Sequence, residues 1–120
     1  MENPQTAVVL HFRDGRTMRE ESAPSIDLDR RNVTAGELNV PFDELKAVFF
    51  RREKAPEGEP PLANGSVVSV EFADGEVLRG MTHDYNPIAS GFYITPLDEM
   101  KLQRVFVVSS AVIAIEVEKL

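Results

Sequence analysis

Cysteine is absent from this chain of 120 residues. Its absence excludes disulfide bridges, thiolate catalysis and cysteine-ligated metal sites, and it is typical of a cytoplasmic protein, the location that we expect. No apolar run approaches the ~20 residues that a helix needs to cross a bilayer, so we expect no membrane insertion. Residues 1–6 also lack the basic start and the apolar core of a secretory signal.

Catalytic signatures are missing as well. The sequence has no Gly-x-Ser-x-Gly motif, no phosphate-binding loop and no Gly-x-Gly-x-x-Gly motif. Ser109 and Ser110 lie between apolar runs without an evident base, which nucleophilic catalysis requires. His83 and Asp84 are adjacent, but a structural metal site needs about four ligands. We therefore expect a protein that is not an enzyme and that holds no metal and no cofactor.

Positive charge is scarce. The chain has 13 Lys and Arg against 20 Asp and Glu, which gives a net charge of −7 at pH 7. In residues 7–54 nine basic and nine acidic residues cancel, whereas residues 66–120 carry four basic and eight acidic ones, a net of −4. Affinity for nucleic acid comes largely from Lys and Arg that neutralise phosphates. The composition therefore argues against a nucleic-acid partner.

Two Asp-Gly hairpin patterns organise the chain. Residues 7–20 align without gaps on residues 67–80, and five of the fourteen positions are identical. In both stretches apolar residues alternate with other residues, which predicts strands with one buried face. Asp-Gly between such runs is a strong hairpin signal, because glycine adopts a positive φ at little steric cost. The identical pairs are Val8/Val68, Phe12/Phe72, Asp14/Asp74, Gly15/Gly75 and Arg19/Arg79.

The similarity continues beyond the hairpins. Residues 45–50 can be laid on residues 112–117, so the offset grows from 60 to 67 positions. The chain therefore reads as a first β repeat at 7–54, a Pro/Gly linker at 55–65 and a second β repeat at 66–120. Within the first repeat we expect a strand at 26–29, a polar loop at 30–36 and a strand at 37–42. In the second we expect a strand at 92–95 and no more than a helical turn at 97–102.

Two stretches are apolar at every position, Ala47-Val48-Phe49-Phe50 and Val105-Phe106-Val107-Val108. A strand that is apolar on both faces is buried on both faces, but a lone small barrel buries only one face of each strand. We therefore predict that Phe49, Phe50 and Phe106 lie in an interface between the two repeats. An interface in a homodimer is the alternative.

The motifs of the second repeat carry a family resemblance. Asp74-Gly75 in the hairpin, Arg79-Gly80 at the end of the next strand and residues 104–108 resemble the Sm-like and SH3-like small barrels. More narrowly, residues 7–118 resemble a bacterial family of unknown function that is built of two such repeats. That family is sometimes joined to PilZ-type or other signalling domains. In the first repeat Glu20 replaces the glycine of the Arg-Gly pair.

The fold that we expect is all-β. The resemblance implies two tandem SH3-like or Sm-like small barrels related by a pseudo-twofold. One larger β-barrel or sandwich with strands shared between the repeats is the alternative.

Three arginines form one candidate binding cluster. Arg13, Arg16 and Arg19 surround the first hairpin, where guanidinium groups can bind a phosphate or a carboxylate. The alternative is that they pair with neighbouring acidic residues such as Asp14 and Glu20 at a solvated hairpin tip, where ion pairs contribute little.

The loop at residues 83–93 is the second candidate. It contains His83, Tyr85 and Asn86 and ends at Tyr93. Two aromatic rings on a proline-stiffened loop suit a recognition surface, because tyrosine supplies contact area at a low entropy cost. The alternative is that Tyr85 merely covers the end of a barrel.

These observations favour a non-enzymatic protein-interaction or regulatory module, an adaptor in bacterial signalling, whose partner is another protein. A homodimer is an alternative form of the partnership. A small-ligand sensor that uses the 83–93 loop is the alternative function. Nucleic-acid binding by an Sm-like barrel is a second alternative, against which the net charge argues.

Overall fold

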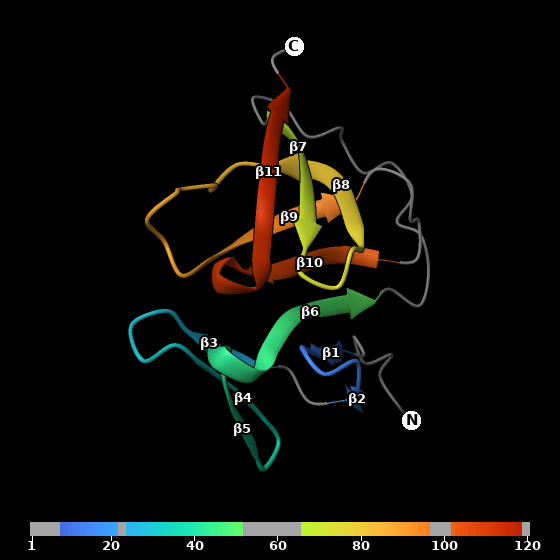
Figure 1. Ribbon diagram of the computed structural model, residues 1–120. Coiled ribbons are helices and arrows are strands. Elements are labelled where there is room, and N and C mark those ends of the chain that lie inside the picture. Colours follow the sequence, from blue (N-terminus) through green and yellow to red (C-terminus); the bar gives the residue numbers. More distant parts are fainter. Residues whose placement is uncertain (1–7, 22–23, 52–65, 97–101, 119–120) are drawn as a thin grey trace, which may run out of the picture.

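The computed structural model describes residues 8–21, 24–51, 66–96 and 102–118. Within these ranges the chain is all-β, as expected, with eleven strands, two short 3-10 turns and no α-helix (Figure 1). The expected linker at 55–65 and most of the expected helical turn at 97–102 lie outside the described residues. We refer to residues 8–51 as the N-terminal half and to residues 66–118 as the C-terminal half.

The N-terminal half forms two sheets. Its strands are β1 (Val8–Phe12), β2 (Thr17–Glu20), β3 (Ser25–Asp27), β4 (Asn32–Ala35), β5 (Leu38–Pro41) and β6 (Leu45–Arg51). Strand β1 pairs with β2 on one side and with β6 on the other, whereas β3, β4 and β5 make a separate three-stranded sheet. All of these pairs are antiparallel.

The expectation of a polar loop at residues 30–36 is wrong. Strand β4 occupies most of this stretch, and its Val33 and Ala35 side chains belong to the core while Thr34 is exposed. Only two apolar residues alternate with polar ones here, so the alternation is too short to predict a strand. A tight turn with Gly36 at φ 60° then connects β4 to β5.

The C-terminal half contributes five strands. They are β7 (Ser66–Phe72), β8 (Val77–Thr82), β9 (Gly91–Pro96), β10 (Leu102–Val108) and β11 (Val112–Glu118). Strand β10 pairs with β6 of the N-terminal half, so one eight-stranded sheet of order β11-β7-β8-β9-β10-β6-β1-β2 runs through both halves. Figure 1 shows β6 and β10 side by side across the middle of the molecule.

The two Asp-Gly hairpins make the same backbone hydrogen bonds. The Phe12 N–H donates to the Arg16 carbonyl oxygen at 2.9 Å, and the Phe72 N–H donates to that of Glu76 at 2.9 Å. Gly15 and Gly75 have φ angles of 94° and 92°. Residues with a side chain rarely adopt such angles, which explains why both turns contain glycine.

Each half also has a 3-10 turn before its last strand. A 3-10 turn precedes the last strand, at η1 (Phe42–Glu44) in one half and η2 (Ser109–Ala111) in the other. The pairings β1·β6 and β7·β11 both contain an irregularity in register close to this turn. The two halves therefore share their local geometry at the positions that the sequence alignment pairs.

The β6·β10 junction is buried on both faces. The side chains of Ala47, Val48 and Phe50 are buried on β6, and those of residues 105–108 are buried on β10. The ring of Phe106 lies 5.6 Å from that of Phe42, in the N-terminal half. Because successive strand residues point to opposite faces, Val105 and Val107 face the other way, so both faces of β10 pack in the hydrophobic core.

Phe106 also depends on a glycine. A Cβ atom placed on Gly91 would lie 2.1 Å from Cζ of Phe106, far inside van der Waals contact. The two residues lie on the paired strands β9 and β10, and the ring fills the space that a side chain at residue 91 would need. The absence of a side chain there is what allows the ring to reach the core of the N-terminal half.

We predict that Phe106→Ala lowers the free energy of unfolding by about 3–5 kcal/mol, the usual cost of removing a well-packed aromatic ring. Urea unfolding followed by circular dichroism measures the change. Val77→Ala is the control, because Val77 is 60% exposed on a strand of the same sheet and should change stability little. Equal effects of the two substitutions would show that the junction does not hold the halves together.

Candidate functional site

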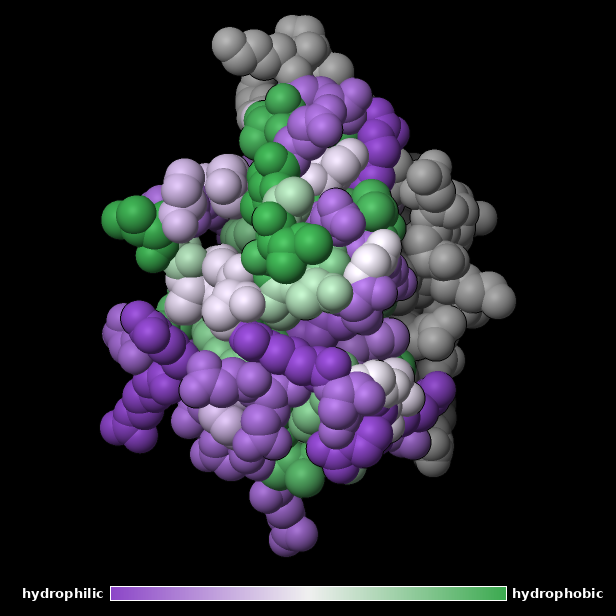
Figure 2. Space-filling view, viewed as in Figure 1, coloured by the Kyte–Doolittle hydropathy of each residue, from purple (hydrophilic) through white to green (hydrophobic). Residues whose placement is uncertain are grey.

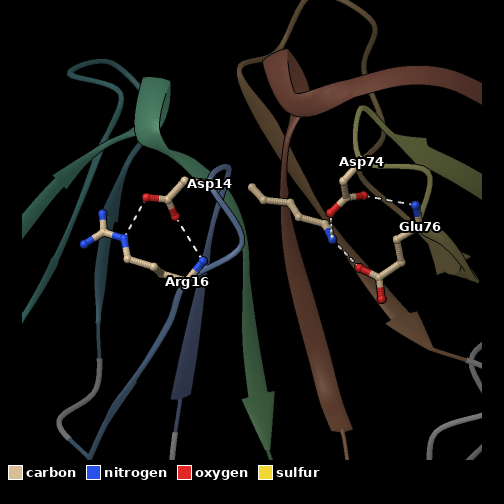
Figure 3. Close-up of polar contacts among 5 residues, drawn as sticks. Asp14, Arg16, Asp74 and Glu76 are labelled. Atoms are coloured by element: carbon tan, nitrogen blue, oxygen red, sulfur yellow. Dashed lines mark hydrogen bonds and ion pairs between the residues drawn. The ribbon is translucent and has the colours of Figure 1, made fainter.

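A buried lysine joins the two halves at their hairpin end. Lys46 lies on β6, directly after the 3-10 turn η1, and its side chain is only 8% exposed. Its Nζ donates a hydrogen bond to Asp74 Oδ2 at 2.7 Å, forms an ion pair with Glu76 and lies 4.8 Å from the centre of the Phe72 ring. Figure 3 shows the Asp74 and Glu76 side chains at the second hairpin turn, next to the first turn with Asp14 and Arg16.

The ion pair between Lys46 and Asp74 keeps its charges at neutral pH. The hydrogen bond from Lys46 and the backbone N–H of Glu76 hold the pKa of Asp74 below its ordinary value. Burial by itself lowers the pKa of Lys46, but the hydrogen bonds to Asp74 and Glu76 outweigh burial and raise it. The clamp between the halves therefore consists of one buried cation and two partly exposed carboxylates.

Two members of the predicted arginine cluster, Arg13 and Arg16, bind groups of their own chain. Arg13 donates from Nε to the Leu45 carbonyl oxygen at 3.1 Å and from Nη2 to that of Phe42 at 2.9 Å, and it also donates to the Ser110 hydroxyl. Arg16 pairs with Asp14 at 2.7 Å. The third member, Arg19, is exposed on β2, and an anion site at this hairpin stays a prediction.

A small recess opens between these groups. It encloses about 300 Å³ of empty space, part of it open solvent, and its polar atoms already bind one another. Its lining residues are Arg13, Lys46, Phe72, Ala73, Asp74, Ser110 and Ala111. No local sequence pattern predicts the contact of Lys46 with the second hairpin, because Lys46 and Asp74 lie 28 residues apart.

The 83–93 loop is organised by Asp84. Its Oδ1 accepts a hydrogen bond from the Tyr93 backbone N–H at 3.1 Å and lies 3.1 Å from the hydroxyl of the buried Thr82. The Asn86 side chain accepts from the Ile88 N–H at 3.1 Å, so it shapes the turn. His83 is exposed at the start of the loop. From the sequence, His83 and Asn86 were candidates of this loop, Asp84 was considered only as a metal ligand, and Thr82 carried no signal.

The two tyrosines of the candidate loop do not form one surface. The Tyr85 ring packs edge-on at 5.0 Å from Phe92, whereas the Tyr93 ring lies 5.1 Å from Phe106 and 4.6 Å from the Arg104 guanidinium. Phe92 and Tyr93 are neighbours on β9 and point to opposite faces. Burial raises the pKa of Tyr93, with Arg104 acting against it.

The predicted interface residues lie at the β6·β10 junction. Phe50 and Phe106 are buried there, and the Arg104 guanidinium lies 4.6 Å from the Phe50 ring. Phe49 is half-buried on the other face of β6, with its ring 4.1 Å from that of His11.

Strand β11 is the last strand of the eight-stranded sheet, and among the described strands only β7 pairs with it. Ile113 is 63% exposed and Val117 is 46% exposed, while Ile115 is half-buried between them. The position on β6 that aligns with Val117 is Phe50, which is 5% exposed. β6 lies between β1 and β10, whereas β11 pairs with β7 and has no second neighbouring strand within the described residues.

The exposed apolar residues of β11 form a hydrophobic stripe, bordered by hydrophilic side chains (Figure 2). Edge strands in natural proteins usually carry a proline, a lysine or a bulge that prevents pairing with other chains. The sequence of β11, Val-Ile-Ala-Ile-Glu-Val-Glu, contains neither proline nor lysine, although it has an irregularity in register at its start. This edge is the most accessible apolar surface that we find on a regular element of the described chain.

Two findings limit other kinds of site. No group of three or more His, Asp or Glu side chains able to hold a metal ion occurs in residues 8–21, 24–51, 66–96 and 102–118. No helix in those ranges is long and apolar enough to cross a membrane.

Comparison with known families matches residues 6–119 to a family of unknown function (DUF6982). The match covers nearly the whole chain, and the protein belongs to this family. Searches of curated proteins and of solved structures found no significant match.

We predict that Asp74→Asn lowers the melting temperature at pH 7, because Lys46 loses one of its two charged partners. The pKa of Asp74 is depressed in the folded state, so its contribution is present above its ordinary value of 3.8 and is lost as pH falls through the lower folded pKa. The difference from the unsubstituted protein should therefore shrink below about pH 4. Differential scanning calorimetry between pH 3 and 7 measures it.

Asp14→Asn is the matched control. Asp14 and Asp74 accept the same turn hydrogen bond, each at 3.0 Å, from the backbone N–H two residues later, and asparagine preserves that acceptor. Asp14 pairs only with the exposed Arg16 among the described contacts, so its substitution should have the smaller effect. Equal losses would contradict a clamp at Lys46.

Proposed function

We propose that this protein is a non-enzymatic protein-interaction module, an adaptor that binds its partner by adding a strand to the free edge of β11. The observation that carries the proposal is the edge of β11 that no other described strand pairs with, together with its exposed Ile113 and Val117. In strand addition the main-chain hydrogen bonds give affinity, and the side chains on alternate positions give specificity.

The residues of β11 suit this role. The strand is seven residues long, so several outward N–H and C=O groups are available to a partner. Fully burying an isoleucine or valine side chain contributes roughly 1.5–3 kcal/mol, and Ile113 and Val117 have about half of that gain still to make. Apolar contact and backbone pairing therefore act at the same edge.

We also propose an architecture of two small barrels, which supports binding by strand addition. Two tandem SH3-like or Sm-like small barrels, at residues 7–54 and 66–120, are joined by the linker at 55–65. The shared hairpin bonds and the strand order β11-β7-β8-β9-β10 support this description. In it, β10 of one barrel adds to the β6 edge of the other, so strand addition already joins the two halves. The resemblance to a family joined to signalling domains suggests a cytoplasmic setting in bacterial signalling.

The other functions have less support. A ligand sensor at residues 83–93 would use both tyrosines, but Tyr85 and Tyr93 pack on opposite faces of β9. Nucleic-acid binding needs basic surface, and the net charge is −7. At the first hairpin, Arg13 and Arg16 donate hydrogen bonds to groups of their own chain, which leaves fewer donors for a phosphate.

We predict that a photo-crosslinking amino acid at residue 113 forms a discrete adduct in cells that naturally make the protein. The same group at residue 88 is the control, because Ile88 is 91% exposed and samples random collisions more freely than Ile113. Denaturing electrophoresis and mass spectrometry identify the adduct. No adduct at residue 113, or equal adducts at both positions, would contradict the proposed function.

A further inference from the structure

We infer that the occupant of the β11 edge is a second copy of this chain, paired antiparallel about a twofold axis at Ile115. This inference rests on the proposed function, since it names the partner of the same edge. The order of side chains along β11, their charges and the polar character of the edge strand β5 support this pairing.

The apolar residues of β11 are placed symmetrically. Ile115 is the central residue of Val112–Glu118, and the exposed Ile113 and Val117 lie two positions to either side. In an antiparallel pair centred on Ile115, Ile113 of each copy lies opposite Val117 of the other. Cβ atoms of directly opposed residues are about 4.5–5.5 Å apart. One contact therefore covers both exposed residues in each copy.

The acidic residues tolerate this register. Glu116 falls opposite Ala114 of the second copy, and Glu118 falls opposite Val112, so no two carboxylates are directly opposed. Glu118 also keeps its own ion pair with Arg79, at 2.8 Å. A shift of the axis by one residue to Glu116 would place two glutamates face to face, which is destabilising. A shift to Ala114 would leave Val117 beyond the end of the pair.

Pairing through β5 is the competing arrangement, because β5 aligns with β10 and would repeat the internal junction. In that junction Phe106 lies opposite Val48 and Arg104 lies opposite Phe50. The 67-residue offset puts Asn39 in the place of Phe106 and Glu37 in the place of Arg104. Both are exposed polar residues, and Pro41 of the same strand has no N–H to donate.

Strand β5 therefore does not offer an apolar strand to β11. A head-to-tail contact would also leave free edges and build open filaments, whereas a twofold contact closes after two copies. Pairing two β11 strands joins the eight-stranded sheets of both copies into one continuous sheet and leaves neither β11 edge open.

Single cysteines test the register directly, because the chain has none of its own. A disulfide needs Cα atoms about 4.4–6.8 Å apart, and opposed residues in antiparallel strands are about 4.5–5.5 Å apart. Ile115→Cys should therefore form a covalent dimer under mild oxidation. Ile113→Cys alone should not, because its copies lie four residues apart along the strands, or about 14 Å. Mixing Ile113→Cys with Val117→Cys should restore the cross-link.

Light scattering on the unsubstituted protein gives the oligomeric state without relying on any variant. At about 100 µM we expect twice the chain mass of 13.4 kDa. Ile113→Lys should give the mass of one chain, while Ile88→Lys, which adds the same charge at a more exposed position, should leave the dimer intact. Salt screens the repulsion between the like-charged copies. We therefore expect 0.5 M NaCl to leave the dimer associated.

A chain that stays monomeric at this concentration overturns the inference, and so does a dimer that fails to cross-link through residue 115. If the adduct at residue 113 in cells is a different protein and the chain is monomeric, self-pairing is wrong while the proposed function stands. If the chain dimerises through residue 115 and the cellular adduct is a second copy, both are supported.

Discussion

The pairing of β6 with β10 is the interaction on which the rest of the structure depends. It joins the two halves into one eight-stranded sheet, and it buries both faces of two strands. Such burial requires apolar residues at every position, and Ala47 to Phe50 and Val105 to Val108 supply them. Other features follow from this pair: Gly91 makes room for Phe106, and Lys46 lies where the second hairpin can reach it.

The same pairing explains why β11 has only one partner among the described strands. β6 and β11 hold matching places in the two halves, and both pair with the first strand of their own half. β6 receives β10 along its other edge, but no described strand takes that place beside β11. Ile113 and Val117 of β11 stay exposed, and we propose that a second chain completes this half of a junction.

Much of the fold was predictable from local patterns. The Asp-Gly turns and the alternation around them depend on neighbouring residues alone, and so do the two runs that are apolar on both faces. Three features were not predictable, because they depend on distant contacts. Strand β4 presents only Val33 and Ala35 to the core, Lys46 meets carboxylates 28 and 30 residues away, and Asp84 rather than a tyrosine organises the 83–93 loop. Ile113, Ile115 and Val117 alternate with other residues along β11, but alternation cannot tell which strand covers an apolar face.

Hydrogen exchange along β11 tests the central claim most directly, because amides of an unpaired edge exchange freely and paired amides are protected. If another strand occupies the edge, the outward amides of residues 112–118 should exchange more slowly as the protein concentration rises from about 1 to 200 µM. The amides of β5, which is an end strand of the three-stranded sheet, should not change over that range. Fast exchange of the outward β11 amides at every concentration would contradict pairing with a second copy.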